Sequence, residues 1–165
     1  MKKVIVIVGP TAVGKTKMGV RLAQKYNGEV ISGDSMQIYK RMNIGTAKVT
    51  KEEMEGIVHH CIDMKEPNET YSVSQFQKTV RDLIDDIISR NKVPIIVGGT
   101  GLYIKAVLYD YHFDQSKRLF DKDKYKDYTN HQLYDYLKII DPTSAKTIHI
   151  NNRRRILRAI EIYET

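Results

Sequence analysis

The sequence GPTAVGKT, residues 9–16, directly follows the apolar run VIVIV, residues 4–8, and precedes a helical pattern. It fits the phosphate-binding loop pattern G-x-x-x-x-G-K-[ST], which requires a strand before it and a helix after it. Its two glycines let the backbone curl so that amide N–H groups converge on an anion. Lys15 would supply a positive charge, and Thr16 a hydroxyl for Mg²⁺. The sequence therefore predicts a phosphate site on an α/β fold.

The first hundred or so residues alternate between short β-branched runs and longer helical patterns, which indicates a parallel α/β sheet. We expect a P-loop NTPase-like sheet with helices on both faces. The predicted strands are residues 4–8, 29–32 and 92–97. The predicted helices of this part are residues 15–26, 73–89 and 102–108.

The character of the sequence changes after Tyr109, where tyrosines and lysines become frequent. We predict a mobile connection at residues 115–128 and helices at 131–140 and 152–164, which together form a helical appendage. The predicted domains are residues 1–110, the P-loop α/β core, and residues 111–165, a helical and incomplete domain. Since the last helical pattern ends without a Gly or Asn stop signal, we expect the chain to be part of a longer protein.

Composition excludes some classes of protein. The single cysteine, Cys61, cannot form an internal disulfide, which suits a reducing cytoplasm. No apolar run approaches the roughly 20 residues that a membrane span needs, so we expect no membrane association. The net charge of +7 comes from residues 1–50 and 116–165, which suggests a polyanionic partner that contacts both ends.

A phosphate loop alone suggests ATP, but an ATPase or kinase also needs an acid, commonly at the end of a buried strand, to hold its magnesium. The strand VPIIVGGT, residues 93–100, ends without one. The available carboxylate is Asp34, just after the second strand. Because parallel strands open on one crevice at their carboxyl ends, Asp34 and Thr100 should face the phosphate loop.

Asp34 has three possible roles: it can position magnesium, act as a general base, or cap a turn, since Asp before Ser is an ordinary turn pair. Its neighbours Ser35, Gln37 and Tyr39 add hydrogen-bonding groups that suit the edge of a nucleobase, because a glutamine can pair with adenine through two hydrogen bonds. The segment His59-His60-Cys61 is not expected to bind metal, because adjacent side chains point apart.

Five blocks of the chain together resemble one family, the tRNA dimethylallyltransferases, also called tRNA isopentenyltransferases. In order along the chain they are GPTAVGKT, GDSMQIYKRMNIGTAK, HHCIDMKEPNETYSVSQF, VPIIVGGTGLYIKA and IHINNRRRILRAIEIYE. The resemblance implies transfer of a dimethylallyl group from dimethylallyl diphosphate to N6 of the adenosine beside the 3′ end of the anticodon in tRNA. It implies Mg²⁺ as cofactor and the tRNA anticodon stem-loop as partner, and we expect a cytoplasmic monomer.

The resemblance also assigns residues. The diphosphate would bind the loop formed by Gly9, Pro10, Thr11, Ala12, Val13, Gly14, Lys15 and Thr16, with Thr16 as the metal ligand. Asp34 and Thr100 would be catalytic, Asp34 by accepting the proton of the attacking amine. Contacts with tRNA would come from Asp34, Ser35, Met36, Gln37, Arg153, Arg154 and Arg155. Family members normally extend further and usually have a proline where this chain has Val49.

Two other functions stay open at this point. A small-molecule or nucleotide kinase would use ATP in the same loop, and a non-catalytic RNA-binding fragment would use the basic ends of the chain. Within the family, free adenine nucleotide is an alternative acceptor. The segment NNRRRILR is itself compatible with either a solvated helix or a grip on RNA phosphates.

Overall fold

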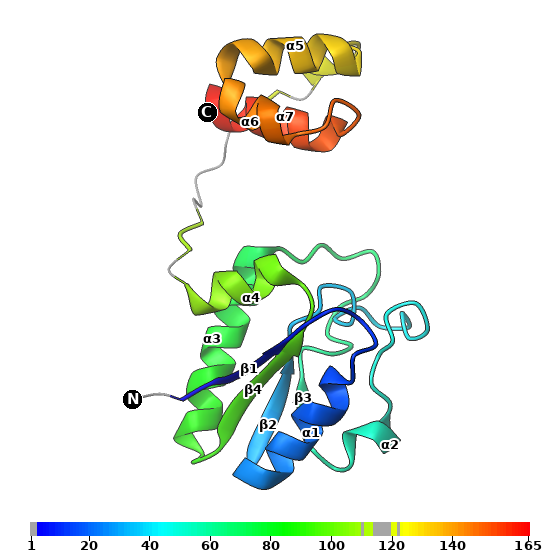
Figure 1. Cartoon of the computed structure of the whole chain (residues 1–165), viewed down its shortest axis with the longest axis vertical. Coiled ribbons are helices and arrows are strands. Elements are labelled where there is room, and N and C mark those ends of the chain that lie inside the picture. Colours follow the sequence, from blue (N-terminus) through cyan, green and yellow to red (C-terminus); the bar gives the residue numbers. More distant parts are fainter. Residues whose placement is uncertain (1–2, 110, 114–119, 122) are drawn as a thin grey trace. The chain divides into compact units, whose positions relative to one another are not determined.

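The computed structural model describes residues 3–109, 111–113, 120–121 and 123–165. The chain divides into two compact units, Met1–Phe113 and Asp114–Thr165 (Figure 1). The predicted domain boundary at residue 110 lies outside the described residues, as do residues 115–119 and 122 of the predicted mobile connection.

The first unit contains a four-stranded parallel sheet in the order β1-β4-β2-β3. The strands are β1 (Ile5–Val8), β2 (Gly28–Ser32), β3 (His59–His60) and β4 (Val93–Gly98). In the register of the sheet, Ile31 lies between Ile96 of β4 and His60 of β3. All four strands run in the same direction, so their carboxyl ends lie along one edge.

Helices cover both faces of this sheet, as the sequence predicts (Figure 1). On one face, α1 (Lys15–Tyr26) packs Ala23 against the β2 and β4 side chains Val30, Ile95 and Val97. On the other face, α3 (Val73–Ser89) and α4 (Gly101–Leu108) pack against Ile31 and Ile96. The alternation of successive strand residues between the two faces produces these two apolar layers.

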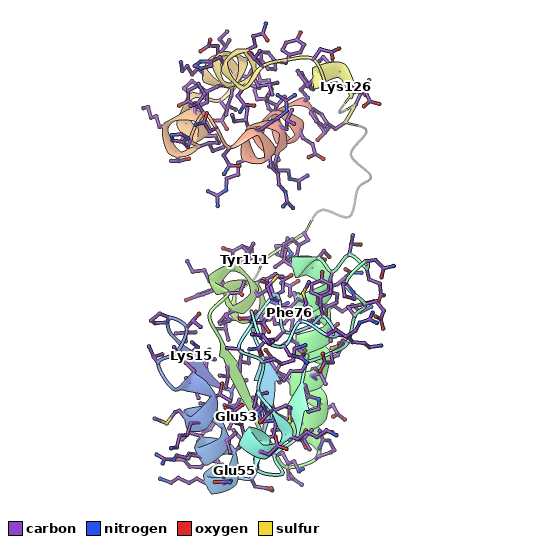
Figure 2. The ribbon with its side chains drawn as sticks, turned by 90° about the vertical axis from the view of Figure 1, so that its right-hand side faces the viewer. Lys15, Glu53, Glu55, Phe76, Tyr111 and Lys126 are labelled. Atoms are coloured by element: carbon purple, nitrogen blue, oxygen red, sulfur yellow. The ribbon has the colours of Figure 1, made fainter. Side chains whose placement is uncertain are left out.

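The helix α3 shows why the sequence folds locally as it does. Ser72 accepts a hydrogen bond from the Gln75 amide, and Gln75 bonds back to the Ser72 amide, which forms a capping box. Phe76, Val80, Ile84 and Ile87 recur at helical spacing and are all buried. The Phe76 ring, labelled in Figure 2, lies 4.6 Å between centroids from Tyr103 of α4.

The second unit is helical, with α5 (Asn130–Ile140), α6 (Pro142–Thr147) and α7 (Arg153–Glu164). Its core contains the buried side chains of Leu133, Leu137, Ile156 and Ile160. Tyr125, in the short 3₁₀ helix η1 (Asp123–Tyr125), packs against the same core and hydrogen-bonds to Glu164. Unit two therefore has an apolar core of its own.

The longer predicted elements agree with the structure to within one residue at each end. Four short elements were not predicted: α2 (Lys51–Met54), β3, η1 and α6. Each is too short to show a hydrophobic period, which needs a window of about 11 residues or more. Within the described ranges, no helix is both long and apolar enough to cross a membrane.

Candidate active site

A cavity of about 480 Å³ lies in the first unit beside the phosphate loop. Four groups of residues line it: the phosphate loop with the start of α1, the ends of β2 and β4, the segment after β2, and residues 45–53 with β3. The lining thus includes Thr11, Ala12, Gly14, Lys15, Thr16, Lys17, Ser32, Asp34, Met36, Gln37, Thr46, Ala47, Val49, Glu53, His59, Ile62, Gly98 and Gly99.

The phosphate loop joins β1 to α1, in the context that its sequence pattern requires. Gly14 caps the start of α1 with φ +82°, a left-handed conformation that glycine adopts without steric cost. Lys15 begins the helix (Figure 2), and its Nζ donates to the Pro10 carbonyl oxygen at 2.5 Å. The Lys15 side chain therefore folds back over the loop, while Thr16 lines the cavity beside it.

The ends of β2 and β4 approach each other more closely than side chains would allow. The Gly33 amide donates to the Val97 carbonyl oxygen at 2.8 Å. A Cβ atom on Gly98 would lie 2.5 Å from the Gly33 carbonyl carbon, so only glycine fits at position 98. This contact sets the spacing of the two segments that follow, which carry Asp34 and Thr100.

Asp34 both caps a turn and lines the cavity. Its Oδ1 accepts hydrogen bonds from the Met36 amide at 2.8 Å and from the Gln37 amide at 3.4 Å. The capping role that an Asp-Ser pair suggests is therefore present, and it fixes the orientation of the carboxylate. Because Asp34 also lines the cavity with Lys15 and Thr16, capping does not remove it from the site.

Ser35 and Thr100 join the two segments behind the cavity. The Ser35 amide donates to Thr100 Oγ1 at 3.1 Å, and the Thr100 hydroxyl contacts Ser35 Oγ at 3.4 Å. Among the described residues that line the cavity, neither of these two occurs. Thr100 thus lies beside the turn of Asp34 and supports it.

Gln37 is a structural link between β2 and the cavity wall. Its Oε1 accepts from the Ser32 hydroxyl at 3.0 Å, and its Nε2 donates to the carbonyl oxygens of Thr46 at 3.1 Å and Ala47 at 3.3 Å. Both amide hydrogens have acceptors within the protein. The prediction that Gln37 contacts a nucleobase stays a prediction, but its amide is already engaged.

Lys48 secures the same wall, a role that sequence reasoning missed. Its side chain is only 4% exposed, and its Nζ donates to Asp63 Oδ1 at 2.6 Å and to the Tyr39 carbonyl oxygen at 2.6 Å. A buried lysine must be paired, so this contact holds residues 39–48 against residue 63. The sequence carries no signal for it, because a lysine in a polar segment is ordinarily solvated.

His59 lies in the cavity wall with one ring nitrogen unpaired. Its Nδ1 donates to the Ile57 carbonyl oxygen at 2.9 Å, and its enclosed Nε2 finds no hydrogen-bond partner among the described residues. Burial lowers the pKa of His59, so the ring is neutral at pH 7 and Nε2 is an acceptor. Nothing in the sequence marks this histidine as part of the site.

The neighbouring His60 points to the other face, as expected for adjacent strand residues. Its Nε2 lies 2.7 Å from Oε2 of the buried Glu29, which Arg90 and Lys92 also contact. Hydrogen bonds from Arg90, above all, hold the pKa of Glu29 far below its usual range. Among the described residues, no three His, Cys, Asp or Glu side chains are grouped so that they could hold a metal ion.

The three predicted RNA-binding arginines lie at the start of α7 and differ in their surroundings. The Arg153 guanidinium donates to the backbone carbonyl oxygens of Tyr128 at 2.5 Å and Tyr125 at 2.7 Å. Arg154 and Arg155 are exposed. Arg153 is thus engaged within its own unit, whereas the other two face solvent.

Comparison with known proteins gives consistent matches. The family model of the IPP transferases matches residues 37–165. A tRNA dimethylallyltransferase of Anoxybacillus flavithermus is 55% identical over 166 residues, covering 98% of this chain and 52% of that protein. One from Bacillus pumilus is 56% identical over 167 residues, with the same two coverages.

Solved structures match in the same way. A tRNA isopentenylpyrophosphate transferase from Bacillus halodurans superposes with a TM-score of 0.67 at 49% identity, covering 99% of this chain and 56% of that one. A eukaryotic dimethylallyltransferase acting on tRNA superposes with a TM-score of 0.83 at 40% identity, covering 99% of this chain and 42% of that one. The chain spans about half the length of the curated relatives that it matches.

Proposed function

The chain belongs to the IPP transferase family, that of the tRNA dimethylallyltransferases, and we propose that it transfers a dimethylallyl group from dimethylallyl diphosphate to N6 of the adenosine 3′-adjacent to the anticodon in tRNA. The observation that carries the proposal is the cavity, which is lined both by the phosphate loop and by Asp34. It combines an anion site with an acceptor for a proton, and these are the two requirements of the reaction.

The donor would bind with its diphosphate on residues 9–16. The backbone amides of the loop, the positive end of α1 and Lys15 all favour negative charge there. When the carbon–oxygen bond of the donor breaks, charge increases on the departing diphosphate. These groups therefore stabilise the transition state more than the ground state, which is the condition for a faster reaction.

The acceptor amine would attack the carbon from which diphosphate leaves. The exocyclic amine of adenine is a poor nucleophile, and the new carbon–nitrogen bond forms as one of its protons is lost. Asp34 would orient the amine and accept that proton. The turn contacts of its Oδ1 with Met36 and Gln37 hold the carboxylate in place beforehand.

The residues of the cavity fit a hydrated Mg²⁺. Mg²⁺ prefers oxygen ligands and keeps several of its waters, so it needs few protein ligands and several acceptors around them. Thr16 would hold the ion with its hydroxyl, and the carboxylate of Asp34 on the same cavity would accept hydrogen bonds from the waters of the ion. When bound, the ion would supply positive charge that neutralises the diphosphate.

Transfer of the dimethylallyl group to RNA also needs side chains that bind the RNA phosphates. Arg154 and Arg155 are exposed on α7 and would contact the backbone of the acceptor. Arg153 would act by holding the start of α7 in place through its carbonyl contacts. Residues 111–165 would then form a tRNA-contacting domain.

The cavity also suits a base as acceptor. Because reaction at a base inside a duplex or stacked loop requires that base to leave its stack, an enclosed cavity suits the reaction better than an open face.

The alternative, a kinase that uses ATP in the same loop, is less well supported. In such enzymes the acid that holds the magnesium commonly ends a buried strand. Here β4 leads instead into Gly99 and Thr100, which leaves Asp34, after β2, as the carboxylate of the cavity.

One assay tests the proposal. The protein would be incubated with labelled dimethylallyl diphosphate, Mg²⁺ and either an adenosine-containing anticodon stem-loop or AMP, with ATP hydrolysis followed in parallel. We expect label on the stem-loop. Label on AMP alone would assign a mononucleotide acceptor, and ATP consumption without prenylation would support the kinase.

A further inference from the structure

A second hollow of about 530 Å³ adjoins the cavity described above. It is formed by residues 41–46 together with Met36. Met36, Gly45 and Thr46 line both spaces, so the two adjoin at these residues. A ligand whose reacting part lies in the first cavity would therefore have its neighbouring part close to the second.

The hollow presents apolar side chains to solvent. Ile44 is 97% exposed and Met36 is 45% exposed. A single exposed apolar residue is ordinary, but here two of them line a hollow that opens beside a reaction cavity. Such an arrangement offers a flat apolar ligand a surface that is already free of competing protein contacts.

Ile44 is held by a structured turn. The Thr46 hydroxyl donates to the Met42 carbonyl oxygen at 2.5 Å. The Lys48 amide donates to the Asn43 carbonyl oxygen at 3.1 Å, and the Ala47 amide donates to the Ile44 carbonyl oxygen at 3.2 Å. The links from Gln37 and Lys48 described above hold the base of the turn. Binding at Ile44 would therefore require little ordering of the chain.

The hollow has a guanidinium group on one side. Arg41 lines it with a side chain that is 77% exposed and lies 2.5 Å from Glu66. Exposed ion pairs of this kind are weak, so Arg41 can exchange Glu66 for a phosphate at small cost. Apolar side chains beside an exposed guanidinium suit a nucleobase followed by its phosphate.

We propose that this hollow receives the nucleobase that neighbours the target adenosine in the acceptor RNA, with Ile44 against the base. The inference rests on the proposed function, since it takes the acceptor to be RNA. When the target base leaves its stack, the face of its neighbour is uncovered, and apolar side chains such as isoleucine commonly occupy such a position in nucleic-acid complexes. A free adenine nucleotide has no such neighbour, so the hollow would favour RNA over a mononucleotide.

A double-mutant cycle tests the contact. The protein and its Ile44→Ala variant would be compared on three anticodon stem-loops: one unaltered, one abasic on the 5′ side of the target and one abasic on the 3′ side. We expect Ile44→Ala to weaken binding of the unaltered stem-loop and to lower kcat/KM on it about tenfold, from the lost burial of the side chain. One of the two abasic stem-loops lacks the base that Ile44 contacts. On that stem-loop Ile44→Ala should change binding and kcat/KM little, because the contact is already absent.

Leu108→Ala provides the control, because Leu108 is also an exposed aliphatic residue, 46% exposed at the end of α4 in the first unit, and should leave every value unchanged. Thermal unfolding would verify that both variants are folded. Equal losses from Ile44→Ala on all three stem-loops, or no loss on any, would overturn the proposal. Dissociation constants and transfer rates are measured separately, so a protein that binds with this pattern but transfers no prenyl group would refute the proposed function and leave the hollow supported.

Discussion

The backbone amide of Ser35 donates to the hydroxyl oxygen of Thr100 at 3.1 Å, which joins the segments that follow β2 and β4 although 65 residues separate them in the chain. Asp34 immediately precedes this contact. The position of its carboxylate relative to the phosphate loop therefore depends on two adjacent strands and on one side-chain hydrogen bond between their ends.

We predict that Thr100→Val slows the transfer step while donor binding is retained. The valine keeps the shape of threonine but cannot accept from the Ser35 amide, so the turn that carries Asp34 loses its support. Small displacements of reacting groups reduce rates strongly, and we expect kcat to fall about tenfold to a hundredfold. Single-turnover kinetics with labelled donor would measure it. Thr100→Ser, which keeps the hydroxyl, should restore most of the rate, and an unchanged rate in Thr100→Val would mean that Thr100 has no positioning role.

The two roles of Asp34 can be separated by substitution. Asp34→Asn keeps an oxygen that can accept from the Met36 amide and thus preserves the turn, but it removes the negative charge and the proton acceptor. We expect kcat to fall by about 10² to 10⁴, the usual contribution of a general base, with little change in the dissociation constant of the donor. Asp34→Ala should lose the turn as well and be less stable in thermal unfolding. Loss of donor binding in Asp34→Asn would instead assign the carboxylate to the metal.

Glu29 gives the first unit an acid-sensitive stability. Arg90, Lys92 and His60 surround its buried carboxylate, and the pKa of Glu29 is held far below the ordinary glutamate value of 4.5. At a pH below about 5 the unfolded chain takes up this proton before the folded chain does, so stability should fall as pH is lowered through that range. Urea unfolding at pH 7 and at pH 4 would measure the change.

Glu29→Gln should remove that pH dependence and cost about 3 kcal/mol at pH 7, because the surrounding cations lose their counter-ion. Asp86→Asn is the matched control, since Asp86 also contacts Arg90 but is 57% exposed, and it should have a much smaller effect. A steep acid dependence that persists in Glu29→Gln would contradict this explanation.

The strands, the long helices and the phosphate loop could be predicted because each is encoded locally. The apolar run of β1, the period of α3 and the spacing of Gly14 and Lys15 are all visible within one stretch of sequence. That Asp34 follows β2 near the loop could be predicted from the geometry of parallel sheets.

The remaining walls of the cavity could not be predicted, because they depend on contacts between distant segments. From the sequence, Gln37 is a candidate for base recognition. In the structure its side-chain amide donates to the carbonyl oxygens of Thr46 and Ala47. Lys48 looks solvated until its link to Asp63 is seen, and His59 belongs to a strand of two residues that shows no period. Arg153 likewise resembles its two neighbours in sequence and differs from them only in what it contacts.

This difference leads to a prediction about the three arginines. Arg154→Gln and Arg155→Gln should each weaken stem-loop binding and reduce the slope of log affinity against log salt by about 0.7 to 0.9 if each contacts one phosphate, with the free energy of unfolding unchanged.

Arg153→Gln should behave in the opposite way. Its guanidinium holds the carbonyl oxygens of Tyr125 and Tyr128, so its loss should cost about 2 kcal/mol of stability and leave the salt dependence intact. Fluorescence anisotropy over a salt series, together with urea unfolding, would give both quantities for each variant. Because all three substitutions remove the same charge, a common effect of net charge on RNA binding would alter the three slopes equally, and that result would refute the separate roles assigned to Arg153 and to the exposed pair.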